Sequence, residues 1–187
     1  MSFFEIKNRF TGSVLFSLET ETMKLCVEAA IRGGSDLRGS DLRGSDLRGS
    51  NLSNSDLRGS NLSNSDLRGS DLRGSDLRGS DLSNSDLSNS DLSGSDLRGS
   101  YLSGAKIRDG ITITQPPIFL SGLTWDVSIF DGHMKIGCEF YSHVEWESFD
   151  DQTIIKMGSS DALKFWRENK EILLTLCRNH AARAQKK

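Results

Sequence analysis

The 187-residue chain carries 23 basic and 26 acidic residues, so its formal net charge is −3 and excludes strong attraction to nucleic acid or anionic membrane. Only 35% of the residues are apolar, which is typical of disordered chains, but the strict periodicity described below argues against disorder. No apolar run approaches the ~20 residues that a membrane-spanning helix needs. Three widely spaced cysteines, Cys26, Cys138 and Cys177, favour free thiols, and the N-terminus lacks the pattern of a signal peptide. We therefore expect a cytoplasmic protein.

Residues 1–34 predict a hairpin followed by a helix. Apolar residues flank the Thr11-Gly12 turn on both sides and suit two short strands. A helix is expected from about Thr22 to Arg32, with Thr20 or Thr22 as its N-cap and Gly33-Gly34 as its end. Cys26 lies on the apolar face of this helix and is expected to be a small core residue.

A five-residue repeat follows. Every fifth residue from Leu37 to Leu102 is leucine, and fourteen consecutive pentads over residues 35–104 share the formula Ser–(Asp/Asn)–Leu–(Arg/Ser)–(Gly/Asn). Tyr101 departs from this formula, and a degraded unit over residues 105–109 has Ile107 in the leucine position. A period of five fits neither the 3.6 residues of a helix turn nor the 2.0 of a strand. The pentad must therefore turn regularly, and Gly or Asn at its end tolerates positive φ.

Residues 35–109 resemble the pentapeptide-repeat family, whose pattern is A(D/N)LXX. The resemblance implies a right-handed quadrilateral β-helix, a solenoid with four pentads per coil. The chain departs from the family in having Ser at the inward small position, where Ala is usual. Such uniform repeats suit either a consensus design, grafted between the natural caps of a bacterial or phage-type member, or a recently expanded natural repeat, and both origins stay open.

Four pentads per coil place residues twenty apart above one another. Fifteen pentads then form about 3.75 coils, roughly 18 Å long at ~4.8 Å per strand. One interior ladder consists of Leu37, Leu57, Leu77 and Leu97. Each inward Ser hydroxyl must bond a backbone carbonyl or another Ser, because an unbonded buried hydroxyl costs about 1–3 kcal/mol.

Residues 110–187 predict an α+β region. Alternating apolar residues on both sides of Asp131-Gly132 indicate a hairpin, with Met134 to Phe140 as its second strand and Cys138 on the apolar side. Two helices are expected, near residues 150–157 and 160–182. The apolar face of the second is expected to comprise Leu163, Trp166, Ile172, Leu173, Leu176 and Cys177. This region resembles the C-terminal part of some bacterial and phage-associated members, through His133–Cys138, Trp146 and Phe165-Trp166.

The open ends of a β-helix expose apolar side chains and unpaired strand edges. We therefore expect residues 1–34 to cap the N-terminal end of the solenoid over residues 35–109, and residues 110–187 to cap its C-terminal end. The predicted fold is mainly β, with these α-containing caps.

Candidate sites are few. His133, Cys138 and His143 are close in sequence but fit no standard zinc spacing, so no metal site is expected. No nucleophile, Walker A or calcium-repeat motif occurs, and no carboxylate differs from its neighbours, so we expect neither enzyme activity nor a cofactor. If a specific site exists, it should lie in the C-terminal region, where His133, His143, Trp125 and Trp146 are unique.

The outward arginines offer one possible interaction stripe, formed by Arg38, Arg58, Arg78 and Arg98. Each follows an Asp by two residues, so the row is either a basic stripe for an acidic partner or a set of exposed ion pairs. The second interpretation is favoured because Asp cancels most of the charge.

The sequence thus predicts a non-catalytic structural scaffold or protein-interaction module. The alternative, which the family resemblance implies, is a DNA mimic that inhibits or protects a type II topoisomerase, as quinolone-resistance members do. Residues 35–109 carry 12 Asp against 9 Arg and 1 Lys, a net of −2, which is weakly acidic for such a role. No direct nucleic-acid or membrane binding is expected, and the partner and oligomeric state stay open.

Overall fold

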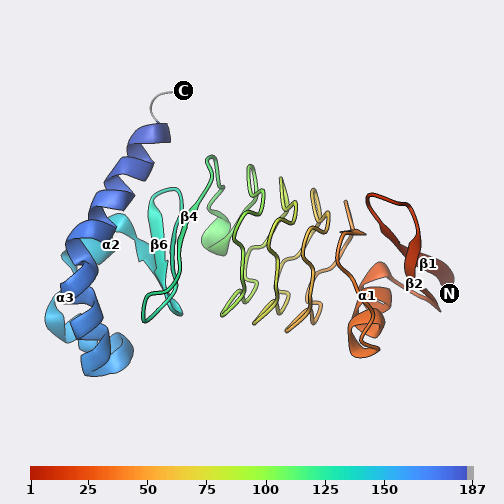
Figure 1. Ribbon diagram of the computed structural model, residues 1–187, viewed down its shortest axis with the longest axis horizontal. Coiled ribbons are helices and arrows are strands. Elements are labelled where there is room, and N and C mark those ends of the chain that lie inside the picture. The colour runs from red at the N-terminus through yellow and green to blue at the C-terminus, as the bar shows by residue number, and fades with distance from the viewer. Residues whose placement is uncertain (185–187) are drawn as a thin grey trace. The chain divides into compact units, whose positions relative to one another are not determined.

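The computed structural model describes residues 1–184, which form two compact units, one over residues 1–116 and one that begins at Pro117. In the first unit, coils of similar outline stack one after another (Figure 1). The second unit contains a four-stranded antiparallel sheet and two helices. None of the helices among residues 1–184 has the length and apolar character to cross a membrane.

The chain begins with the antiparallel strands β1 (Ser2–Asn8) and β2 (Val14–Thr20), followed by helix α1 (Met23–Arg32). The side chain of Thr22, one of the two expected N-caps, accepts a hydrogen bond from the amide of Leu25, and the helix ends at Gly33. Cys26 is buried in this segment, as predicted, and burial raises the pKa of its thiol. β1 also pairs antiparallel with β3 (Ser40–Asp41), so the hairpin extends the edge of the first coil.

Parallel bridges join residues twenty apart along the repeats. Asp46 pairs with Asp66, and Asp66 pairs with Asp86, with similar bridges at the pentads between them. One coil therefore takes four pentads, and the leucine amides from Leu42 to Leu87 each donate to a carbonyl on the next coil, as Leu47 N–H does to Asp66 at 2.8 Å. The repeat region is a β-helix.

Each pentad ends in a tight turn. Ser60 N–H donates to the carbonyl of Leu57 at 3.1 Å, and the turn carries a residue with positive φ. That residue is Gly59 in this pentad, with φ of 65°, and Asn54 in the preceding one, with φ of 55°. These values place Gly and Asn where the backbone favours them, which is why the fifth position of the repeat is always one of those two residue types.

The repeat leucines fill the interior of the coils. Leu37, Leu57 and Leu77 are at most 1% exposed, whereas Leu97, near the end of the repeat, is 7% exposed. Most inward Ser hydroxyls donate to the carbonyl of the leucine three residues before, as predicted for a backbone partner. These serines are Ser55, Ser70, Ser75, Ser80, Ser85, Ser90, Ser95 and Ser100. Three buried hydroxyls within residues 1–184 lack a hydrogen-bond partner and so depart from the expectation: Ser40, Ser50 and Ser60.

The repeat ends with a return of the chain. Ile107 occupies the leucine position of the degraded pentad and is buried. A single turn of 3-10 helix, η1 (Arg108–Gly110), then reverses the chain, and Thr112 pairs antiparallel with Lys106. Residues 111–113 therefore lie along the exposed edge of residues 105–107.

The second unit has the sheet order β4-β5-β6-β7, with β4 (Ile118–Leu120), β5 (Val127–Ile129), β6 (His133–Ile136) and β7 (Glu139–Ser142). The expected single strand from Met134 to Phe140 is wrong, because Gly137, with φ of 58°, turns the chain between β6 and β7. Cys138 lies at this turn and is exposed, so its prediction as an apolar-facing residue is also wrong.

Two helices complete this unit. α2 (His143–Ser148) was not predicted, although Ser142 and Glu145 form the capping box that its sequence encodes. The two expected helices appear as the halves of α3 (Asp151–Ala184), with non-helical backbone at Gly158 and Ser159. Trp166, Leu173 and Cys177 join the core as expected.

Ile172 is wrongly predicted to lie on the apolar face of α3, because its residue is 61% exposed. It follows Trp166 by six residues, which rotates it roughly 240° around the helix at ~100° per residue. The expected face was therefore too broad by one residue.

Candidate interaction surface

One face of the coils carries an unbroken row of charge pairs. We call this row the Arg–Asp ladder, and its members are Asp36/Arg38, Asp56/Arg58, Asp76/Arg78 and Asp96/Arg98. Asp56, Asp76 and Asp96 are joined in sequence by parallel bridges, and Gly39 N–H donates to Arg58 on the next coil at 2.9 Å. The twenty-residue coil thus brings together the four arginines of the predicted stripe.

Each pair has the same local geometry. In the second pair, Asp56 Oδ1 accepts the backbone N–H of Arg58 at 3.3 Å and its Nε–H at 2.8 Å, while Nη2 donates to Oδ2 at 2.5 Å. An Asp side chain that bonds the backbone two residues ahead stabilises a turn. The ion pair is therefore built onto the turn of the pentad, which explains why Asp precedes Leu and Arg follows it.

The pairs also connect one coil to the next. Arg58 Nε lies 3.5 Å from Asp76 Oδ2, and Arg78 Nε lies 3.5 Å from Asp96 Oδ2. These contacts, between an arginine and the aspartate eighteen residues ahead, were not predicted from the sequence. The signal was present, because stacking at a spacing of twenty places each Arg near the Asp that begins the pair above it. The ladder is consequently a chain of alternating charges.

The arginines of the ladder stabilise the ionised form of its aspartates. The hydrogen bond from Arg38 lowers the pKa of Asp36 to about 2. The corresponding arginines lower the pKa of Asp56, Asp76 and Asp96 as well, against a smaller opposing effect of burial. None of these four carboxylates has the raised pKa that a general acid at neutral pH requires.

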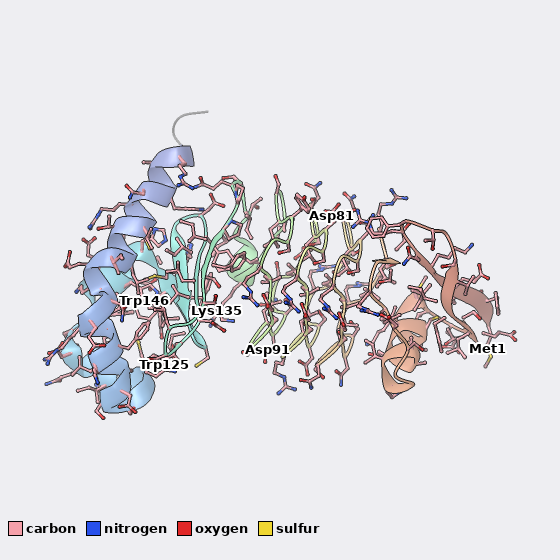
Figure 2. The ribbon with its side chains drawn as sticks, viewed as in Figure 1. Met1, Asp81, Asp91, Trp125, Lys135 and Trp146 are labelled. Carbon is pink, nitrogen blue, oxygen red and sulfur yellow. The ribbon has the colours of Figure 1, made fainter. Side chains whose placement is uncertain are left out.

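A neighbouring face has an arginine on one coil only, and its chemistry differs from that of the ladder. It carries Asp41/Arg43 on one coil and then Asn61/Ser63, Asp81/Ser83 and Tyr101/Ser103 on the coils that stack above it. Here Asn61 Oδ1 accepts hydrogen bonds from the backbone N–H of Ser63 at 3.0 Å and from the Ser63 hydroxyl at 2.7 Å. Asp81, labelled in Figure 2, makes the same bonds to Ser83. The turn geometry is kept, whereas the alternating charges are not.

The structure does not arrange His133, Cys138 and His143 as ligands of one metal ion. His143 Nε2 lies 3.0 Å from the carbonyl oxygen of His133, and the His133 ring stacks on Phe140 with centroids 5.3 Å apart. Burial lowers the pKa of His143. Cys138 lies at the exposed turn instead. Across residues 1–184, no group of three or more His, Cys, Asp or Glu residues is arranged to hold a metal ion.

Comparison with known proteins gives matches over the repeats. The model of the family described as pentapeptide repeats (8 copies) matches residues 35–74 and 70–109. Among curated proteins, no sequence matches the chain.

Several solved structures are similar to part of the chain. A pentapeptide repeat protein from the Arabidopsis thaliana thylakoid lumen is 31% identical over 36% of this chain and 47% of its own, with a TM-score of 0.36. A second, from the cyanobacterium Cyanothece, is 29% identical over 39% of this chain and 56% of its own, with a TM-score of 0.23. A third, from Nostoc, is involved in regulating heterocyst differentiation and is 28% identical over 38% of this chain and 40% of its own, with a TM-score of 0.17. This chain thus spans about half the length of the first two structures that it matches.

Proposed function

Residues 35–109 are pentapeptide repeats, and on that premise we propose that the protein is a non-catalytic scaffold that presents the Arg–Asp ladder to a protein partner. The observation that carries the proposal is the unbroken ladder itself, since the neighbouring face keeps the same turns but has an arginine only at Arg43. A function that resides in the fold alone would not require four identical pairs on one face. The proposed partner is a cytoplasmic protein.

The finer geometry proposed with this function is a right-handed coil with four sides. The twenty-residue register and one positive-φ residue per pentad support four corners per coil. The pairing of β1 with β3 supports residues 1–34 as the N-terminal cap. Residues 110–187 are proposed as the C-terminal cap, with the antiparallel return at Thr112 as its first part.

The chemistry of the ladder suits a partner surface that bears carboxylates. A guanidinium group has five N–H donors in a fixed plane, and the bonds of Arg58 and Arg78 to their aspartates use Nε and Nη2. The remaining donors are available to a partner, because the side chains of Arg58 and Arg78 are 41% and 43% exposed. Exposed ion pairs contribute little to stability, so a partner can share these arginines at low cost to the fold.

Support for a non-catalytic role comes from the sameness of the repeat carboxylates. Catalytic groups need a pKa matched to their task. In active sites, neighbouring titratable groups therefore often have different pKa values. In the ladder, every aspartate is shifted in the same direction by the same kind of bond. No member of the ladder is therefore distinguished as an acid, a base or a nucleophile.

The alternative of a topoisomerase inhibitor that mimics DNA has weaker support. Mimicry of DNA requires a row of negative charges, whereas each aspartate of the ladder is paired with an arginine. A supercoiling assay with DNA gyrase separates the two proposals. The scaffold proposal predicts no inhibition at micromolar protein, and inhibition would favour the alternative.

The test of the scaffold proposal uses substitutions that the repeat already accepts. Ser stands in the arginine position at Ser63 and Ser83, so the double variant Arg58→Ser/Arg78→Ser should fold. The matched control is Arg48→Ser/Arg68→Ser, which removes two arginines from a different face. Crosslinking in the cells that express the protein should recover a partner with the wild type and the control but not with the ladder variant. Equal recovery by both variants would refute the ladder as the interaction surface.

A further inference from the structure

The second unit contains a cavity of about 260 Å³ that the scaffold proposal does not use. Its walls come from the turn between β6 and β7, from α2 and from both halves of α3. The aromatic residues that line it are Trp125, Trp146, Phe165 and Trp166. Figure 2 labels Trp125 and Trp146, whose rings lie between the strands and α3. An engineered cavity of ~150 Å³ in another protein holds benzene, so this one has room for a larger group.

The aromatic walls are fixed by specific contacts. Trp146 Nε1–H donates to the carbonyl of Met134 at 2.8 Å, which directs the polar edge of this indole toward β6. Trp125 meets Phe165 edge-on with ring centroids 5.1 Å apart, and Trp146 lies 5.2 Å from Trp166. Burial of Trp146, Phe165 and Trp166 to 5% exposure or less holds these rings in place. The cavity is therefore preorganised rather than formed by a mobile surface.

The turn at Gly137 closes one side of the cavity. A Cβ atom added at this residue would lie 3.3 Å from Cδ1 of Trp125, so the indole packs directly against the backbone of the turn. Cys138 and Glu139 follow at the rim. Within the described residues, Glu139 is the one cavity-lining side chain that carries a charge, and that charge is negative.

The opposite wall depends on strained backbone. Ser159 has φ of 82° and ψ of −173°, a conformation that is essentially restricted to glycine. Together with Gly158, it interrupts α3 so that Met157 before the break and Ala162 after it both line the cavity. Residues held in such conformations cluster at binding sites, and this is an observation independent of the aromatic lining.

The same aromatic cluster already contacts a cation within the chain. Lys170 Nζ lies 5.5 Å from the centroid of the Trp166 ring, although Lys170 does not line the cavity. Aromatic faces attract cations through the ring quadrupole, most strongly at Trp, and aromatic cages are used to recognise methylated ammonium groups. The carboxylate of Glu139 places a negative charge at the rim, which favours a cationic ligand over a neutral one.

We propose that this cavity binds a methylated ammonium group, held by the faces of Trp125, Trp146 and Trp166 and by the carboxylate of Glu139. The group could be carried by a small quaternary amine or by a methylated lysine of a partner protein, since both present the same chemistry. The binding needs no covalent step. It is independent of the Arg–Asp ladder, so either proposal can fail without the other.

The experiment uses the full chain and two natural reporters. All three tryptophans of the chain line the cavity, so their fluorescence reports on binding. Cys138 is exposed at the rim, whereas Cys26 and Cys177 are buried, so a thiol reagent modifies Cys138 first. Choline should change the fluorescence and slow the alkylation of Cys138. Its neutral isostere, 3,3-dimethylbutan-1-ol, should bind about threefold to thirtyfold more weakly, the range that a cation–π contribution provides.

Variants and peptides identify the groups responsible. Glu139→Gln should weaken choline binding several-fold, and Trp125→Leu, at a half-buried position, should do the same while keeping an apolar wall. The matched control Glu171→Gln, on the exposed side of α3, should bind as the wild type does. A peptide with trimethyllysine, compared with the same peptide carrying lysine, distinguishes a protein ligand from a small amine. Equal binding of the neutral isostere, no binding of any methylated amine, or full binding by Glu139→Gln would each overturn the proposal.

Discussion

The repeat region and the second unit reach stability by opposite routes. In the repeats, leucine recurs at the same interior position of each pentad, so Leu57 and Leu77 lie in equivalent, fully buried positions. In the second unit, each core residue is different, and Trp146, Phe165 and Trp166 fit one another through individual ring contacts. Repetition makes an extended surface with a fixed register, whereas irregular packing makes a cavity with a fixed shape. The two regions are therefore suited to different kinds of ligand.

The largest expected effect tests the equivalence of the repeats. Leu57→Ala and Leu77→Ala should each lower the free energy of unfolding of the first unit by about 2–5 kcal/mol, because each leaves a cavity in a closely packed interior. The two values should agree within about 1 kcal/mol, since both leucines lie between neighbouring coils. Urea unfolding followed by circular dichroism measures both. A large difference between the two losses of unfolding free energy would contradict the equivalence of the repeats, which is what distinguishes them from the second unit.

The inward serines sharpen the comparison within the repeat itself. Ser80 donates to the carbonyl of Leu77 at 2.6 Å, whereas Ser60, one coil earlier, is buried without a partner. Ser80→Ala should therefore cost about 1 kcal/mol, while Ser60→Ala should be neutral or stabilising by a similar amount. Thermal unfolding of both variants beside the wild type is the measurement. Equal losses at the two sites would show that Ser60 is also satisfied in solution.

A backbone substitution probes the irregular unit. Ser159→Gly should stabilise the second unit by about 0.5–1 kcal/mol, because glycine adopts φ of 82° without strain. The loss of the bond from Asp161 N–H to the Ser159 hydroxyl offsets only a few tenths of a kcal/mol. Glu168→Gly, in the interior of the second half of α3, is the control and should be destabilising by about 1 kcal/mol. Tryptophan fluorescence during urea unfolding reports on this unit, and destabilisation by Ser159→Gly would contradict the inferred strain.

The smallest expected effect is the acid dependence of the ladder. Asp36 has its pKa lowered to about 2 by Arg38, below the ~3.9 of an unfolded chain. The unfolded state thus binds more protons at low pH, so the contribution of this pair is complete above about pH 4 and is lost as the pH falls toward 2. The effect is small because the pairs are exposed and screened.

The ladder variant provides the control for this acid dependence. Arg58→Ser/Arg78→Ser removes the partners that lower the pKa of Asp56 and Asp76, so its urea midpoint should fall less between pH 5 and pH 2.5. The same acid dependence in wild type and variant would mean that the pairs do not stabilise the folded coils.

The sequence predicts the regular region far better than the irregular one. A leucine every fifth residue, with Gly or Asn at the end of each pentad, is a signal repeated along the chain, so it indicates the turns, the interior and the stacking of Arg38 on Arg58. It does not reveal the unpartnered hydroxyl of Ser60, because identical pentads differ there only through their neighbours in space. That difference belongs to the packing of the coils and not to the repeat.

The second unit offers each of its signals only once. The alternation from Met134 to Phe140 suits one strand as well as two, and only the positive φ of Gly137 decides between them. The sequence predicted two helices with a gap where α3 is interrupted. The cavity beside this break was not predicted, because it depends on contacts among residues far apart in sequence. Trp125 and Trp146 were recognised as unique, whereas the role of Glu139 becomes visible only when the rim of the cavity is assembled.

The central claim is that residues twenty apart stack and so form a single ladder. It is tested most directly by crosslinking paired cysteines with a short bifunctional thiol reagent, after replacing the exposed Cys138 with Ser. The pair Arg58→Cys/Arg78→Cys should crosslink efficiently, because stacked strands lie ~4.8 Å apart. The pair Arg58→Cys/Arg73→Cys should not, although the Arg73 side chain is 61% exposed and that of Arg78 only 43%. Equal or greater crosslinking of the second pair would contradict the twenty-residue register and, with it, the ladder.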